Sequence, residues 1–299
     1  MVVSRHAKGV LCIVASAFGF ALMAFFVRLC DDFGEPISSF QKSFFRNCIA
    51  LLIAAAVFAR QARASGGYAL LVSHHEIRVW SILVLRATLG TIGIFANFYA
   101  IGKIPIGEAM TLNKTAPFFT VFFAWLFLGE RVNGRQLLAL VLAFAGAMLV
   151  MKPGTSGFIA VGGLLPPAMW GFVSGMCAGG AYACVRYLAL HRVNGALIIL
   201  FFSVFSCLAA VPFMVNHVDV MTVAQVMALL GAGVGAAMGQ FGITAAYRYA
   251  TPSSIAVYDY SNIIFTGLLG FLFFGQVPDW LGVTGFTLIL TGVAHLKSK

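Results

Sequence analysis

The chain has 299 residues, of which 61% are hydrophobic and only 9% are charged. A soluble domain carries about 25% charged residues, so this composition excludes a disordered chain and argues against a soluble globular enzyme. The net charge of +10 would suggest nucleic-acid binding in a soluble protein. Here basic residues that flank membrane segments account for the charge better, and we expect a lipid bilayer and no nucleic acid as the partner.

Long apolar segments recur along the chain, and each is close to the ~20 residues that a helix needs to cross a bilayer. We therefore predict an all-α integral membrane protein with ten transmembrane helices in the plasma (inner) membrane. The predicted spans cover residues 9–29, 37–59, 79–101, 105–128, 134–151, 163–187, 195–215, 222–247, 253–274 and 280–296.

Basic residues divide unevenly between the two sides of these spans. With the N-terminus placed inside, twelve Lys and Arg residues fall in inner segments, whereas only Arg28, Lys103 and Lys152 fall in outer loops. Because Lys and Arg are retained on the cytoplasmic side, we predict that the N- and C-termini are both cytoplasmic.

Features of the first half of the chain recur in the second half. Gly129 and Gly275 each follow an apolar run and lie 146 residues apart, and Gly146 and Gly292 are separated by the same interval. Recurrence at a fixed interval predicts that the chain consists of two copies of one unit.

Each unit, residues 1–152 and residues 160–299, contains five predicted helices. Because five is odd, the second unit must enter the membrane from the opposite side, which makes the repeats inverted. Inverted repeats are typical of secondary transporters, which hold their substrate near the bilayer midplane between the repeats. The alternative is duplication without transport, but a duplicated membrane chain with so little mass outside the bilayer favours transport.

Several motifs surround the fourth predicted helix. Leu128-Gly129-Glu130-Arg131 stands at its inner end, Tyr99-Ala100-Ile101-Gly102-Lys103-Ile104-Pro105 and Pro117 precede that motif, and Gly146 follows it. Arg46 lies in the second helix. Together with the ten-helix plan, these residues resemble the drug/metabolite transporter superfamily of the EamA-repeat type. The resemblance implies an exporter of small metabolites, often amino acids, with no ATP-binding domain. In the second half the sequence departs from the pattern, because Gln276 stands where the family often has Glu.

Ionisable residues inside the spans are expected to have a structural or functional role, because inserting each charged side chain costs at least about 2.5–3.5 kcal/mol at the membrane centre. Lys114 lies nine residues beyond Pro105, roughly 13 Å into the bilayer. Asp259 lies about 10 Å into the ninth span and corresponds to Asn113 under the 146-residue interval. Inverted repeats would bring these segments together, so we expect Lys114 and Asp259 to interact directly or through water, in a substrate site or in a structural salt bridge.

The spans also contain Lys42, Arg46, Arg86 and Glu108. We expect Arg46 to face the substrate from deep in the second helix, and Lys42 and Glu108 to reach the outer surface. Arg86 either extends to the inner surface or faces the interior. The candidates for coupling or gating are Asp259, Glu108, Lys42 and Arg86.

The excess of positive charge in the spans favours a ligand that carries a carboxylate. An amino acid fits, with its carboxylate on a cation and its ammonium on Asp259, and aromatic residues would accommodate an apolar side chain. The predicted substrate-binding residues are Lys114, Asn113, Arg46, Tyr99, Trp170, Tyr258, Asp259 and Tyr260.

We therefore expect a secondary transporter that exports small carboxylate-bearing metabolites, most of all amino acids, by alternating access. Alternatives are a transporter of nucleoside derivatives or cationic drugs, an importer, a passive facilitator and an intramembrane enzyme. The spans hold no carboxylate pair or His/Cys cluster at catalytic spacing, so we expect no enzyme activity. The six cysteines form no Cys-x-x-Cys pair and no phosphate-binding loop is present, so we expect no metal and no cofactor. The sequence leaves the oligomeric state open and is compatible with a monomer.

Overall fold

The computed structural model describes residues 4–35, 37–65, 76–101, 103, 110, 112–151, 167–215, 218–275 and 277–297, and these contain helices and turns with no strand. Helix formation satisfies the backbone hydrogen bonds inside each segment, as an apolar environment requires. In the first half of the chain the helices are α1 (Arg5–Asp32), α2 (Ser39–Ala64), α4 (Ile77–Ile101), α6 (Ala116–Leu128) and α7 (Gly134–Met151). In the second half they are α8 (Pro167–Leu190), α9 (Gly195–Met214), α10 (Val223–Tyr249), α11 (Pro252–Ile255), the 3₁₀ helix η2 (Ala256–Tyr260), α12 (Ser261–Phe274) and α13 (Trp280–Lys297).

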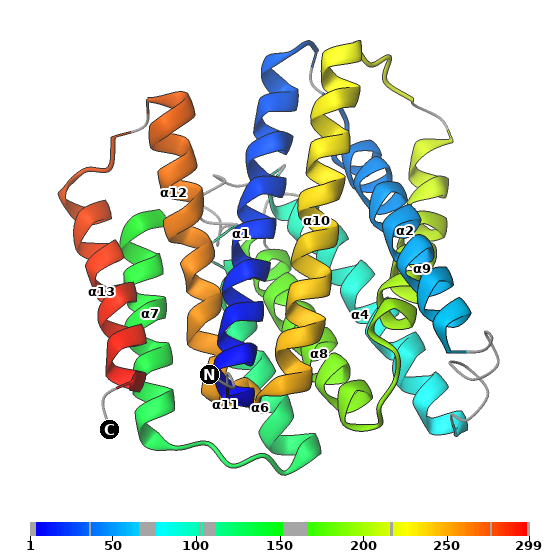
Figure 1. Cartoon of the computed structure of the whole chain (residues 1–299). Coiled ribbons are helices and arrows are strands. Elements are labelled where there is room, and N and C mark those ends of the chain that lie inside the picture. Colours follow the sequence, from blue (N-terminus) through cyan, green and yellow to red (C-terminus); the bar gives the residue numbers. More distant parts are fainter. Residues whose placement is uncertain are drawn as a thin grey trace.

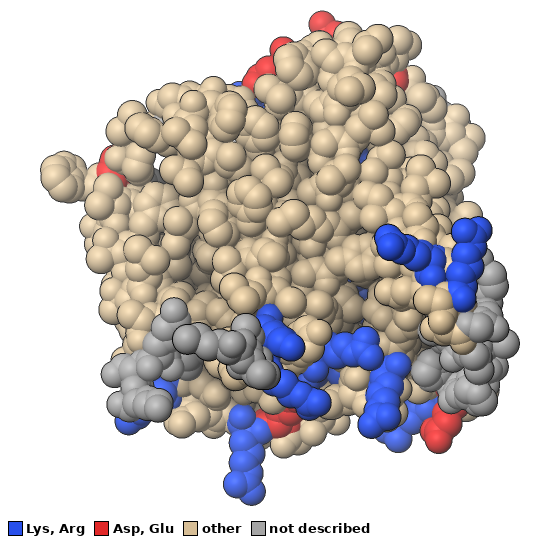
Figure 2. All heavy atoms as spheres, viewed as in Figure 1, with Lys and Arg blue, Asp and Glu red and all other residues tan. Residues whose placement is uncertain are grey.

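Seven helical segments in the described part of the chain are long and apolar enough to cross a membrane, and three shorter apolar helices accompany them. These helices confirm the prediction of an all-α, multi-pass membrane protein. The helices run roughly alongside one another, and both ends of the chain lie at the same end of the bundle (Figure 1). On the face that Figure 2 shows, Lys and Arg gather toward that end, and most of the visible Asp and Glu lie at the other.

Helices from the two halves of the chain pack against each other. The most extensive pairings are α1 with α10, α4 with α8, α7 with α13 and α2 with α9. Small residues make these approaches possible, because a Cβ placed on Gly146 of α7 would lie only 2.5 Å from the carbonyl oxygen of Gly285 on α13. The α7–α13 packing therefore requires glycine at both Gly146 and Gly285.

The ninth predicted span, residues 253–274, is interrupted in the structure and does not form one continuous α-helix. It divides into α11, η2 and α12, with Asp259 in η2. At the boundary, the Ser261 hydroxyl donates to the Tyr258 carbonyl (2.7 Å) and gives that oxygen a side-chain partner. Such local bonds compete with the α-helical pattern and favour a break.

The fourth predicted span, residues 105–128, is also interrupted where it is described. Lys114 and Thr115 form a turn, and α6 begins only at Ala116. Thr115 Oγ1 donates to the Leu112 carbonyl (2.6 Å), and Pro117 stands at the helix start, where a missing N–H costs least. Both interruptions therefore use a hydroxyl that bonds the carbonyl three residues earlier.

The ends of α6 and α12 also share one geometry. Each helix is followed by a glycine in the left-handed region, with φ of +67° at Gly129 and +63° at Gly275. Each of these glycines donates its N–H to the carbonyl five residues earlier, on Ala124 and Gly270 respectively. A left-handed residue after a helix is a common stop signal, and glycine adopts it without steric cost.

Candidate functional site

The two interruptions meet inside the bundle through an ion pair. Lys114 Nζ lies 3.7 Å from Asp259 Oδ2, and the two side chains are 12% and 13% exposed. The contact that the sequence predicts between these residues is present. At this degree of burial, each charge would be costly without the other, so the pair holds the two breaks together.

Tyrosines on either side of Asp259 support this arrangement. Tyr260 is fully buried and donates its hydroxyl to the main-chain oxygen of Lys114 (2.8 Å), and Tyr258 is also buried. The hydroxyl of Tyr260 is thus already engaged by the segment that carries Lys114. Its visible role is to fix the two interruptions relative to each other.

Asn113 links the first interruption to α8. Its Nδ2 donates to Oγ of Ser174 (2.6 Å), and Ser174 is fully buried. The segments touch closely here, because a Cβ on Gly175 would lie 2.6 Å from the Leu112 carbonyl oxygen. The position of Lys114 is therefore set by α8 as well as by η2.

Arg86 of α4 lies in the interior and does not extend to the inner surface. It is 2% exposed, and its guanidinium carbon lies 3.7 Å from the centre of the Phe202 ring on α9. Its Nη2 donates to Gln240 Oε1 on α10 (2.8 Å), while Nε and Nη1 have no hydrogen-bond partner among the described residues. Of the two alternatives for Arg86, the structure shows the interior one, because the ring and the amide retain the guanidinium inside.

Arg46 of α2 is a further cation whose guanidinium has a buried nitrogen. Its Nη1 contacts Sδ of Met23 (3.3 Å), its Nη2 donates to Asn47 Oδ1 (3.2 Å), and its buried Nε has no partner in the described part of the chain. Among the described residues, Arg46 and Arg86 form no ion pair with a carboxylate. Each of these two arginines therefore carries a positive charge that no carboxylate among the described residues pairs with.

The remaining charged candidates lie elsewhere. Lys42 forms an ion pair with Asp31, close to where α1 ends and α2 begins. Glu108 lies outside the described residues, so its predicted role stays a prediction.

Two of the predicted aromatic residues pair with each other. The rings of Tyr99 on α4 and Trp170 on α8 have centroids 5.7 Å apart, and Tyr99 is 42% exposed. Trp170 stands four residues, or about 6 Å along the helix axis, before Ser174. The pair therefore lies about one helical turn beyond the Asn113–Ser174 hydrogen bond.

One ion pair was not predicted from the sequence, in which Arg186 is one of the twelve basic residues assigned to the inner side. Arg186 Nε donates to Glu130 Oε1 (2.7 Å), and its Nη1 donates to the Tyr247 carbonyl (2.7 Å). The bond ties the end of α6 to α8 and α10. The acidic residue in Leu128-Gly129-Glu130-Arg131 was the available signal, because an acid beside a membrane span calls for a partner.

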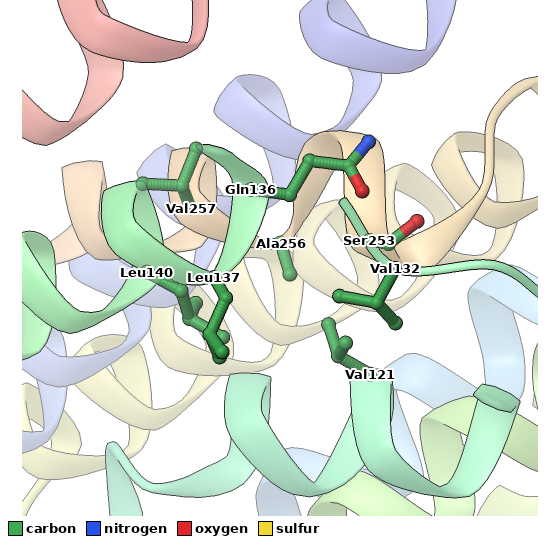
Figure 3. Close-up of a pocket in the computed structure, with 8 residues that line it drawn as sticks. All are labelled: Val121, Val132, Gln136, Leu137, Leu140, Ser253, Ala256 and Val257. Atoms are coloured by element: carbon green, nitrogen blue, oxygen red, sulfur yellow. The ribbon is translucent and has the colours of Figure 1, made fainter. Parts of the chain in front are cut away.

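A narrow pocket lies between α6, α7 and the α11–η2 segment. Apart from Gln136 and Ser253, its lining is apolar, and the chain of η2 passes along one side (Figure 3). None of the predicted substrate-binding residues that the structure describes lines it. Among the described residues, no group of three or more His, Cys, Asp or Glu could hold a metal ion.

Comparison with known proteins relates the chain to membrane transporters. Residues 7–152 match the EamA-like transporter family. The chain is 31% identical over 298 residues to the pseudopaline exporter CntI of Pseudomonas aeruginosa, covering 99% of this chain and 98% of the relative. It is 29% identical to a riboflavin transporter of Vibrio cholerae over 228 residues, 72% of each chain.

A solved crystal structure shares the fold at 17% sequence identity, with a TM-score of 0.76 over 94% of this chain and 95% of the other. The full-length likeness to a transporter at 31% identity and the match to the family over the first half establish the relationship. The chain is a multi-pass membrane transporter that belongs to the EamA-like transporter family, within the drug/metabolite transporter superfamily.

Proposed function

We propose that this protein exports a small carboxylate-bearing metabolite, with amino acids as the first class to test, by alternating access in the inner membrane. The observation that carries the proposal is the Lys114–Asp259 ion pair, which lies where two interrupted helices meet. Secondary transporters form their midplane sites from such interrupted helices. A carboxylate could replace Asp259 on Lys114, while an ammonium group could replace Lys114 on Asp259.

The proposed organisation is two inverted repeats, residues 1–152 and 160–299, with ten transmembrane helices. The helix pairings support it, because exchanging the halves converts the α1–α10 contact into the α8–α4 contact and leaves α7–α13 and α2–α9 unchanged. In the α7–α13 interface, Gly146 meets Gly285, and Gly292 meets Ala139. A shift of 146 residues converts one contact into the other.

The interruptions support the same relationship. The hydroxyl-to-carbonyl bonds of Thr115 and Ser261 are separated by 146 residues at both ends, and the Tyr260–Lys114 bond joins residues that are themselves 146 apart. A pseudo-twofold axis that passes near this bond accounts for these coincidences. The substrate site would then lie on the axis, as alternating access requires.

Cytoplasmic termini are proposed from the charge distribution. Exposed basic residues lie where α2, α8 and α10 end and where α4 and α7 begin, at the end of the bundle that holds both termini (Figures 1 and 2). These residues are Arg60, Arg63, Arg78, Arg131, Arg135, Arg192 and Arg248. Retention of such charge on the cytoplasmic side supports this orientation.

Counterflow in proteoliposomes tests the proposal whatever the direction of transport and whether or not an ion is coupled to it. Liposomes loaded with one unlabelled compound would be tested for uptake of its labelled form, with amino acids, pseudopaline and riboflavin as the panel. We expect uptake of carboxylate-bearing members and its loss in Lys114→Ala, while Arg135→Ala, a change at an exposed cation, retains it. Pseudopaline uptake alone would remove amino acids from the proposal. Uptake of riboflavin alone, or amino-acid uptake that survives Lys114→Ala, would contradict the proposed site.

A further inference from the structure

A group of buried hydrogen-bond donors without partners among the described residues lies apart from the Lys114–Asp259 pair. On α2 these donors are Ser43 Oγ, Arg46 Nε and Asn47 Nδ2, and the spacing of three and four residues puts them on one helix face. Buried polar groups are nearly always satisfied in folded proteins, so several orphans on one face need a cause.

Neighbouring helices add to this group. Within the described chain, Arg86 of α4 leaves Nε and Nη1 unsatisfied, and Ser203 of α9, next to Phe202 in the sequence, has an unsatisfied Oγ. Helix α9 packs against both α2 and α4. Each of these residues is buried, with Arg86 only 2% and Ser203 only 1% exposed.

The two arginines are close to a common neighbour. That neighbour is α9: the Sγ of Cys48, two residues after Arg46, lies 3.8 Å from the Sγ of Cys207, and the Arg86 guanidinium covers the ring of Phe202, five residues or about 7.5 Å earlier on the same helix. Lys42, Lys114 and Arg186 each have a carboxylate within 4.0 Å, whereas Arg46 and Arg86 have none among the described residues. Arginine and amide N–H groups donate only, so what this group lacks is an acceptor with negative charge.

The local packing holds Arg86 in a fixed position. Phe202 covers one face of its guanidinium and Gln240 accepts from one nitrogen. Gly90 leaves the room that the group needs, because a Cβ there would lie 3.0 Å from Nη1 and 2.7 Å from the Phe202 ring. A fixed guanidinium with free N–H groups is a typical binding group for a carboxylate.

We propose that Arg46 and Arg86, with Ser43 and Asn47, form an acid-binding subsite separate from the Lys114–Asp259 pair. The inference rests on the proposed function and narrows its substrate class. The substrate is an amino compound with at least two carboxylates, of which one and the ammonium group exchange with the Lys114–Asp259 pair. The further carboxylate is held by the two arginines, where it supplies the missing acceptor.

Glutamate and glutamine are suitable probes, because they have nearly the same shape and differ by one carboxylate. Binding would be measured on the whole purified protein by ligand-dependent thermal stabilisation, and exchange by counterflow. We expect glutamate to bind at least about tenfold more tightly than glutamine, as a charge-assisted hydrogen bond implies. In Arg86→Gln and in Arg46→Gln the preference should disappear, whereas the exposed control Arg135→Gln should retain it.

The two arginine variants are independent tests, so that Arg46→Gln decides the matter should Arg86→Gln not fold. Equal affinity for glutamate and glutamine would overturn the subsite. So would a preference that persists in the arginine variants, or chloride that competes as well as glutamate does. Preferential glutamate binding without amino-acid counterflow would refute the proposed export and leave the subsite standing. Equal counterflow of glutamate and glutamine would refute the subsite and leave the proposed export standing.

Discussion

The two halves of the chain differ in what they bring to the interior. Helices α1–α7 contribute the cations Arg46 and Arg86, and the turn before α6 contributes Lys114; the second half contributes the carboxylate of Asp259 and the amide of Gln240. The two halves nevertheless share helix pairings, interruptions and helix ends. Packing and charge are thus separable, and the charge that we propose selects the substrate is distributed asymmetrically between halves with similar packing.

The largest expected effect tests the shared packing. Gly146→Val and Gly292→Val should each abolish most folded protein, because the added Cβ would lie 2.5 Å from the Gly285 carbonyl oxygen or 2.7 Å from that of Ala139. Size-exclusion chromatography of purified protein would measure the folded fraction. Gly134→Val is the control, since a Cβ there meets no atom of the described residues within 4 Å. If only one of the two glycines proved essential, the equivalence of the halves would be refuted.

A smaller loss of stability is expected from changes to the Lys114–Asp259 pair, to which the two halves contribute opposite charges. Asp259→Asn removes one partner of a mostly buried pair and should destabilise the fold by about 3 kcal/mol, because Lys114 keeps its charge. The double variant Lys114→Met/Asp259→Leu should recover much of that loss. Thermal unfolding of the variants in one detergent would give the comparison. A double variant less stable than Asp259→Asn would show that the charges do not depend on each other.

The smallest effect tests the shared helix ends. Gly129→Ala and Gly275→Ala should each cost about 1 kcal/mol, because both glycines have positive φ and alanine is strained there. Asparagine at either position should cost less than alanine, since it tolerates this conformation better. Chemical denaturation would resolve the differences. A marked inequality between the two positions would argue that the two helix ends serve different purposes.

Much of the fold could be predicted from the sequence, because apolar length, charge bias and recurring glycines can be recognised without knowledge of the tertiary contacts. The interruptions before α6 and α12 could not, since a hydroxyl that bonds a carbonyl three residues earlier competes with a helix whose composition is otherwise favourable. The Lys114–Asp259 contact could be predicted, because the 146-residue interval relates the two segments. The choice between a surface and an interior position for Arg86 could not be made from the sequence, because it depends on Phe202 and Gln240, which lie far away along the chain.

The most direct test of the proposed acid-binding subsite is a joint measurement on Arg46→Met of melting temperature and of glutamate counterflow. Arg46 has a weak sulfur contact and an adjacent amide as partners, so its replacement by an apolar side chain should leave stability unchanged or higher. Transport should be lost, since we propose that this cation binds the further carboxylate of the substrate. A variant that melts well below the wild type but transports at the normal rate when folded would contradict the account and return Arg46 to a structural role.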